Sequence, residues 1–235
     1  MSVLFMYHSV YETVENPWLQ IRPSSLAEQL DRVRELGYRW TPLREAIAKP
    51  HEKLAALTFD DGFRDFLPAF ETIRARSIPV IQYICPGLLG KTSAWMSSPA
   101  HRNQPLLDAD ELRGLVREGL EIGCHGWTHT RFPEIPIGRL REELGRCVDG
   151  IEHELGTRCE SLAYPYGLCD RARAEVVGEF FSVALAVEPI PDLPTRLALP
   201  RLCGTEGMGR QELAERLAEY ELSRWLPADA LSTPA

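Results

Sequence analysis

The chain has 235 residues, with 26 basic and 34 acidic side chains and a formal net charge of −8 at pH 7. A domain of this length buries enough apolar surface to fold without a disulfide or a structural metal. The acidic balance argues against a nucleic-acid-binding protein and against attachment to an anionic membrane, because both need a basic face. No apolar run reaches the roughly 18 residues of a transmembrane helix, so none is expected.

Short apolar runs alternate with amphipathic stretches along the chain. The predicted strands are 2–7, 54–59, 79–85, 120–124, 161–164, 182–187 and a short run near 198–203. The predicted helices are 25–37, opened by a Ser25–Glu28 capping box, then 65–77, 108–118, 137–155, 170–180 and 209–224. This alternation predicts an α/β fold with a parallel sheet, either doubly wound or closed as a barrel. We predict one domain over residues 1–226 and a C-terminal tail over 227–235.

Three further features concern the longest loop and the cellular compartment of the protein. Segment 86–107 shows no clear periodicity, and loops of that length in compact domains are usually functional or disordered. The six cysteines form no Cys-x-x-Cys pair, which predicts free thiols in a reducing compartment. The first residues have no basic region and too short an apolar run for a signal peptide, so a cytoplasmic location is expected.

Adjacent carboxylates follow the predicted strand 54–59, in the run Thr58-Phe59-Asp60-Asp61-Gly62. Neighbouring carboxylates repel one another when both are ionised, and a bound cation removes that cost. The alternative is that they serve as an N-cap and a first-turn acid for helix 65–77.

Two histidines, His125 and His129, follow the predicted strand 120–124. Histidines four residues apart can bind one ion, although a chance pair is not rare in a chain with six histidines. Their position directly after a strand matches that of the aspartates. Asp61 with both histidines would supply three ligands and leave an open position, as in catalytic metal sites.

Two other strand ends carry candidate groups. Tyr166 lies in Leu162-Ala163-Tyr164-Pro165-Tyr166-Gly167, which is otherwise read as a simple turn. His8 follows the first strand, where a lone histidine is more often structural. The carboxyl ends of parallel strands lie at one edge of a sheet, so these groups are expected to meet there.

Together, the T-F-D-D-G run, the H-x-x-x-H run and the A-Y-P-Y-G turn resemble the first three motifs of the polysaccharide deacetylases, the NodB-homology domain of carbohydrate esterase family 4. The resemblance covers roughly residues 2–205. It implies a deformed (β/α) barrel of about seven parallel strands in a single domain.

The resemblance also implies roles for individual residues. Asp60 would be the general base, and Asp61, His125 and His129 would bind a divalent metal, with Zn²⁺ the default and Co²⁺, Ni²⁺ or Mn²⁺ possible. The backbone N–H of Tyr166 would help to stabilise the oxyanion.

The chain departs from the family pattern at three positions. Gly126 stands where the second motif usually has Ser or Thr, and Ala163 stands where the third motif usually has an arginine that orients the base. No histidine follows His153, so the late Leu-x-His motif that supplies the general acid is missing. In a subgroup resembling bacterial exopolysaccharide deacetylases, an N-terminal Tyr-His-x-Val segment supplies that histidine, which makes His8 the predicted acid. Arg201 is the predicted replacement for the arginine, with a plain surface arginine as the alternative.

Trp127, Trp95 and Pro165 are predicted substrate contacts. Trp127 lies inside the metal motif and could wall the pocket. Trp95 lies in the long 86–107 segment, where it would stack on a sugar ring or pack against the barrel rim.

The predicted function is a metal-dependent N-deacetylase that hydrolyses the acetamide of an N-acetylated amino sugar to a free amine and acetate. The expected substrate is a small glycoside, a nucleotide sugar or a glycan precursor. The alternatives are an amide or imide hydrolase with a non-sugar substrate and a non-catalytic carbohydrate-binding domain on the same fold. The oligomeric state is left open.

Overall fold

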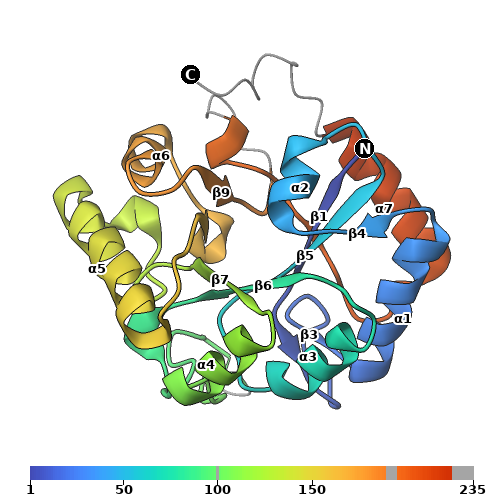
Figure 1. The fold of residues 1–235 in the computed structure, drawn as a ribbon, viewed down its shortest axis with the longest axis horizontal. Coiled ribbons are helices and arrows are strands. Elements are labelled where there is room, and N and C mark those ends of the chain that lie inside the picture. The colour runs from blue at the N-terminus through green and yellow to red at the C-terminus, as the bar shows by residue number, and fades with distance from the viewer. Residues whose placement is uncertain (99–100, 189–194, 224–235) are drawn as a thin grey trace.

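The computed structural model describes residues 1–98, 101–188 and 195–223, and its central sheet curves into a barrel with helices around the outside (Figure 1). The strand order is β10-β1-β5-β6-β7-β8-β9, with β4 paired to β5, and every pairing is parallel. The strands are β1 (Val3–Tyr7), β4 (Arg39–Trp40), β5 (Leu54–Phe59), β6 (Val80–Ile84), β7 (Glu121–Cys124), β8 (Ser161–Ala163), β9 (Val183–Leu185) and β10 (Leu202–Cys203).

Segment 199–203 pairs with β9, at one end of the strand order, and with β1, near the other end. Leu199 pairs in parallel with Leu185 of β9, and its carbonyl accepts the N–H of Ala186 at 2.8 Å. Three residues later, Leu202 of β10 pairs with Phe5 of β1. The pairing therefore distinguishes the two folds that periodicity left open. It confirms a deformed barrel of about seven parallel strands in a single α/β domain.

The helices lie where the amphipathic stretches predicted them, with one addition. They are α1 (Pro23–Glu35), α2 (Leu43–Ala48), α3 (Phe66–Arg74), α4 (Ala109–Arg117), α5 (Ile137–Leu155), α6 (Arg171–Gly178) and α7 (Arg210–Ser223). Single 3₁₀ turns are η1 (Pro86–Leu88), η2 (Phe132–Glu134), η3 (Pro165–Gly167) and η4 (Thr195–Leu197). A separate two-stranded sheet pairs β2 (Ser9–Val10) with β3 (Gln20–Ile21). Helix α2 and strands β2, β3 and β4 were not predicted.

The predicted capping box of the first helix is wrong. Helix α1 begins at Pro23, whose fixed φ suits the first helical position, and Arg22 is the N-cap residue without a side-chain cap. The Ser25 hydroxyl instead donates to Glu206 at 2.8 Å, and Glu28 pairs with Arg32. A complete capping box does open α4, between Asp108 and Glu111.

Alternate residues of the strands build two apolar layers. Phe5 and Tyr7 of β1 pack in the layer between sheet and helices, whereas Leu4 belongs to a cluster inside the barrel. Leu43 and Ile47 of α2 join that inner cluster beside Leu54, the first residue of β5. Helix α2 therefore fills the amino end of the barrel, and the carboxyl ends of the strands remain for polar side chains.

The six cysteines are free thiols, four of them buried. None of the helices in the described part of the chain has both the length and the apolar character that crossing a bilayer requires. The predicted tail, 227–235, lies outside the described residues.

Candidate active site

Asp61, His125 and His129 meet at the carboxyl end of the barrel. Asp61 follows β5, His125 follows β7, and His129 lies in the loop before η2. The Nε2 atoms of His125 and His129 lie 3.4 and 3.0 Å from Oδ1 of Asp61, and one potential ligand atom from each residue falls within 4.8 Å of the others. All three side chains are buried. The structure thus brings the three predicted ligands together.

The hydrogen bonding around these residues fits a divalent cation. Nδ1 of His125 lies 2.7 Å from the Ala163 carbonyl, so this nitrogen carries the proton and Nε2 keeps a free lone pair. Oδ1 of Asp61 is buried, and no donor in the described part of the chain has hydrogen-bond geometry toward it. Burial alone would raise the pKa of Asp61, but His129 and His125 hold it well below its usual value. An ionised carboxylate and two imidazoles are suitable ligands for Zn²⁺ and related ions.

The backbone of the site is strained at three residues. Asp61, His129 and Tyr166 have φ values of 74°, 60° and 59°, in the left-handed region that disfavours side chains. Such conformations cost about 1–3 kcal/mol each and are often found at functional sites. Here they turn the chain sharply after β5, after β7 and within η3.

Asp60 is held by a buried arginine from the other end of the chain. Nη1 and Nη2 of Arg201 donate to Oδ1 and Oδ2 of Asp60 at 2.7 and 2.6 Å, a bidentate pair, and Nη1 also donates to Thr58 at 3.1 Å. Asp60 and Arg201 are both almost fully buried. Burial, the largest single influence, would raise the pKa of Asp60, but the charges of Arg201 and His125 and the hydrogen bonds from Arg201 together lower it. Asp60 is therefore an ionised, fixed carboxylate next to Asp61.

His8 and Tyr166 border the same space. A cavity of about 230 Å³, which we call the strand-end pocket, is lined by His8, Asp60, Asp61, His125, His129 and Tyr166, among others. Nδ1 of His8 is buried and has no hydrogen-bond partner among the described residues. Burial lowers the pKa of His8. The Tyr166 backbone N–H lies in the first turn of η3, where helical N–H groups have no partner within the helix.

The predicted substrate contacts separate into two groups. Trp95 lines the strand-end pocket and stacks on the His129 ring with centroids 4.6 Å apart, so its ring also supports a candidate ligand. Trp127 lies elsewhere, with Arg146 of α5 at 4.5 Å over its ring and Gly150 beneath it. Pro165, in η3 after β8, is buried beside Gly126. Neither Trp127 nor Pro165 is among the residues that line the pocket, and in the turn after β7 only the two histidines face it.

Sequence reasoning missed Asn16, Leu19 and Met96, which also line the strand-end pocket. Asn16 and Leu19 belong to the loop between β2 and β3. The Asn16-Pro17 dipeptide is a turn signal, but it does not indicate which part of the molecule the turn approaches.

Comparison with known proteins adds to this geometry. The family model described as polysaccharide deacetylase matches residues 47–180, which is more than half of the chain. The poly-β-1,6-N-acetyl-D-glucosamine N-deacetylase of Escherichia coli K12 is 29% identical over 144 residues, covering 53% of this chain. The match covers only 20% of that relative's length.

Solved structures share the fold at low identity. IcaB from Ammonifex degensii has a TM-score of 0.76 at 20% identity, covering 92% of this chain and 96% of its own. A polysaccharide deacetylase from Bacillus cereus has a TM-score of 0.75 at 18% identity, covering 92% of this chain and 68% of its own. These likenesses agree with the barrel described above. The family model spans both the aspartates and the histidines and more than half of the chain, so the chain belongs to the polysaccharide deacetylase family.

Proposed function

We propose that the protein is a metal-dependent hydrolase that removes the acetyl group from an N-acetylated amino sugar, releasing acetate. The observation that carries this proposal is the meeting of Asp61, His125 and His129 beside an ionised carboxylate, Asp60, in one pocket. A divalent cation bound by the three ligands would polarise the acetamide carbonyl and acidify a water molecule. Zn²⁺ is the first choice for this ligand set.

Asp60 is suited to act as the base. Its carboxylate is ionised and fixed by Arg201, so it can accept the proton of the attacking water without first losing one. A positioned base of this kind contributes about 10²–10⁴ in rate. The bidentate contact keeps the carboxylate from rotating to bind the cation in place of Asp61.

His8 and Tyr166 serve the later part of the reaction. His8 borders the pocket with a nitrogen that no described residue engages, so it can carry a proton to the departing amine. The Tyr166 N–H is available to donate to the developing oxyanion. The step balances because the C–N bond breaks, the water oxygen becomes a carboxylate oxygen of acetate, and both water protons end on the departing nitrogen, which leaves as an ammonium group.

The pocket and the relatives support the proposed substrate class. A volume of about 230 Å³ accommodates an acetamide group and part of one sugar ring. The aromatic face of Tyr166 at the rim suits the apolar face of a pyranose. The relative from Escherichia coli is named for N-acetyl-D-glucosamine polymer, which supports an N-acetylglucosamine unit as the group attacked.

The test is acetate release from N-acetylglucosamine oligomers, nucleotide sugars and simple amides. We expect EDTA to abolish activity and Zn²⁺ to restore it, and Asp61→Asn to lower kcat/KM by at least about 10³-fold, since a lost Lewis acid is worth several kcal/mol. The matched control Asp149→Asn changes an exposed carboxylate on α5 and should leave kcat/KM unchanged.

Three outcomes would contradict the proposal. Full activity after chelation would exclude metal dependence. Acetate released only from non-sugar amides would favour an amide hydrolase. Calorimetric binding of sugar without turnover in the presence of metal would favour a non-catalytic carbohydrate-binding domain.

A further inference from the structure

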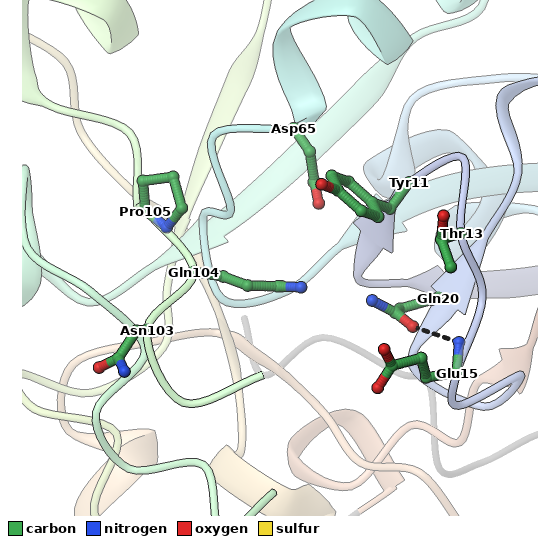
Figure 2. A pocket seen from close by; sticks show the side chains of 8 residues that line it. All are labelled: Tyr11, Thr13, Glu15, Gln20, Asp65, Asn103, Gln104 and Pro105. Carbon is green, nitrogen blue, oxygen red and sulfur yellow. Dashed lines mark hydrogen bonds between the residues drawn. The ribbon is translucent and has the colours of Figure 1, made fainter. Parts of the chain in front are cut away.

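A second cavity lies beside the strand-end pocket. This side pocket has a volume of about 390 Å³, and its lining includes Tyr11, Glu15, Gln20, Asp65, Asn103 and Gln104 (Figure 2). That volume lies within the usual range for small-ligand sites.

The two pockets share their walls. Within the β2–β3 loop, Glu15 lines the side pocket and its neighbour Asn16 lines the strand-end pocket. The segment after η1 likewise supplies Trp95 to the strand-end pocket and Gln104 to the side pocket. A chain of linked sugars that places one residue in the strand-end pocket can therefore place another in the side pocket.

The lining of the side pocket is acidic and rich in amides. Glu15 and Asp65 supply two carboxylates, and no lysine or arginine is found among the described residues that line it. In Figure 2, Asp65, Gln104 and Gln20 project from three separate segments toward a common space. Tyr11 adds a half-exposed aromatic ring at the edge. This chemistry favours a ligand that donates hydrogen bonds and carries positive charge.

Two buried acceptors in this pocket lack donors. Oδ1 of Asp65 and Oε1 of Gln104 are shielded from solvent, and nothing in the described ranges donates to them. The other oxygen of Asp65 accepts the Ser9 hydroxyl at 2.5 Å. Gln20 accepts the Glu15 backbone N–H at 2.9 Å, which leaves its amide NH₂ group facing the cavity. Buried acceptors without partners cost about 1–3 kcal/mol each, and their uncompensated full or partial negative charge favours a cationic group in the adjacent cavity.

We propose that the side pocket binds a second sugar residue of the substrate and selects one whose nitrogen is a free ammonium rather than an acetamide. The proposal rests on the proposed function for the source of such residues: hydrolysis converts the acetamide and water into acetate and an ammonium group. An ammonium group supplies three donors and a charge that complements Glu15 and Asp65. An acetamide offers one N–H donor and adds a carbonyl oxygen, so the carboxylates would lose hydration without gaining a counter-charge.

This selection affects the sequence in which the sugar residues of one chain are deacetylated. A chain that already carries one free amine binds better than a fully acetylated chain of equal length. Deacetylation of one residue therefore promotes attack on another residue of the same chain.

The first experiment measures binding without catalysis. Glucosamine, glucose and N-acetylglucosamine are titrated into the protein and followed by NMR. We expect glucosamine to bind more tightly than glucose, and Glu15→Gln to weaken glucosamine binding by about tenfold, as expected for loss of one charged contact. The Glu15 side chain makes no hydrogen bond or ion pair with the described residues, and Glu52→Gln, just before β5, is the matched control that should bind as the wild type does.

The second experiment measures selectivity in turnover. Wild type should show a lower KM for a partly deacetylated N-acetylglucosamine oligomer than for the fully acetylated one, and Glu15→Gln should bring the two KM values together. Equal binding of glucosamine and glucose, or equal behaviour of Glu15→Gln and Glu52→Gln, would overturn the proposal. If no substrate releases acetate, the proposed function fails, and the titration still decides whether the side pocket binds an amino sugar.

Discussion

Asp60 and Arg201 show how a single contact joins distant parts of the sequence. The two residues are 141 positions apart, and their side chains form a bidentate pair in the barrel interior. Removing one partner of a buried ion pair leaves the other charge uncompensated, which typically costs 3–5 kcal/mol. In the proposed mechanism, Arg201 is therefore a positioning residue that acts through the base, Asp60.

Replacing Arg201 should change the pH dependence of the reaction. In the wild type, Arg201 lowers the pKa of Asp60, so the base stays ionised down to acidic pH. In Arg201→Ala the pKa of Asp60 should rise, which moves the acidic limb of kcat/KM to higher pH and lowers kcat about 10²-fold or more. Arg201→Lys keeps the charge and should shift the limb less.

The measurement is kcat/KM from pH 4 to 9 for wild type, both variants and the exposed control Arg139→Ala. Thermal melts at each pH separate a change in rate from loss of fold. An unchanged acidic limb in Arg201→Ala would show that Arg201 does not position the base.

Single residues were predictable where they follow a recognisable strand. Asp60 and Asp61 directly follow the run 54–59, and His125 and His129 lie within five residues after the run 120–124, so their edge of the sheet could be assigned from sequence. The role of the Ala163 carbonyl could not be predicted. This backbone acceptor lies 2.7 Å from Nδ1 of His125 because β8 pairs with β7, and the identity of residue 163 does not indicate that contact. Trp127 was predicted to contact substrate, but it does not line the pocket. Its position inside the histidine motif did not indicate the direction in which its side chain points.

At the scale of elements, the long helices were predictable and the two-residue strands β2, β3 and β4 were not. Helix α5 spans Ile137–Leu155, the predicted range, because nineteen residues carry several turns of apolar spacing. Strands β2 and β3 have two residues each, too few to show any period. The loop between them lines both pockets, so the missed strands are the ones that carry a shared wall of the two cavities.

Asp65, at the start of α3, should lower the stability of the protein at neutral pH. Burial raises its pKa to about 6, and the hydrogen bonds from Ser9 and Val10 only partly oppose this. The folded state therefore binds a proton more tightly than the unfolded chain, whose usual value is 3.8. The free energy of unfolding therefore falls as pH rises from 3.8 to about 6, and the full destabilisation by the ionised Asp65 is present above about pH 6.

Asp65→Asn should consequently raise the free energy of unfolding at pH 7.5. Each pH unit between the two pKa values corresponds to about 1.4 kcal/mol, so the gain is on the order of 2–3 kcal/mol. The gain should vanish near pH 3.5, where the carboxyl is protonated in both states. Urea unfolding at both pH values, with Asp149→Asn as control, checks this, and an equal gain at both would contradict it. If removing the Asp65 carboxylate stabilises the protein, that result fits a residue that serves binding rather than stability.

At the scale of the whole molecule, closure of the barrel assembles the site. Segment 199–203 joins β9 to β1, and Arg201 lies in that seam, where its side chain reaches Asp60. Strand alternation in the sequence could not distinguish a barrel from an open sheet, because both bury parallel strands between helices. The motif resemblance predicted the barrel, and the pairing of Leu199 and Leu202 on opposite sides of the seam supplies the physical reason.

The same architecture predicts that loss of metal abolishes activity and leaves the fold intact. Both apolar layers are built from strands and helices that do not involve the three ligands, and α2 fills the far end of the barrel. A bound cation adds only linkage stabilisation, about 4 kcal/mol at a thousand times its Kd. Chelation should therefore lower Tm by roughly 8–16 °C from that saturated state, keep one cooperative transition and leave the far-UV circular dichroism spectrum at 25 °C unchanged.

Asp61→Asn provides the internal control, because a variant that cannot hold the cation should melt alike with and without EDTA. Loss of secondary structure on chelation at 25 °C would mean that the metal is a folding element, as in zinc fingers. That result would contradict the argument from size, because a chain of 235 residues buries enough apolar surface to fold without a metal. Activity and stability should therefore respond separately to the same chelator, since the ligands lie at the rim of a core that is complete without them.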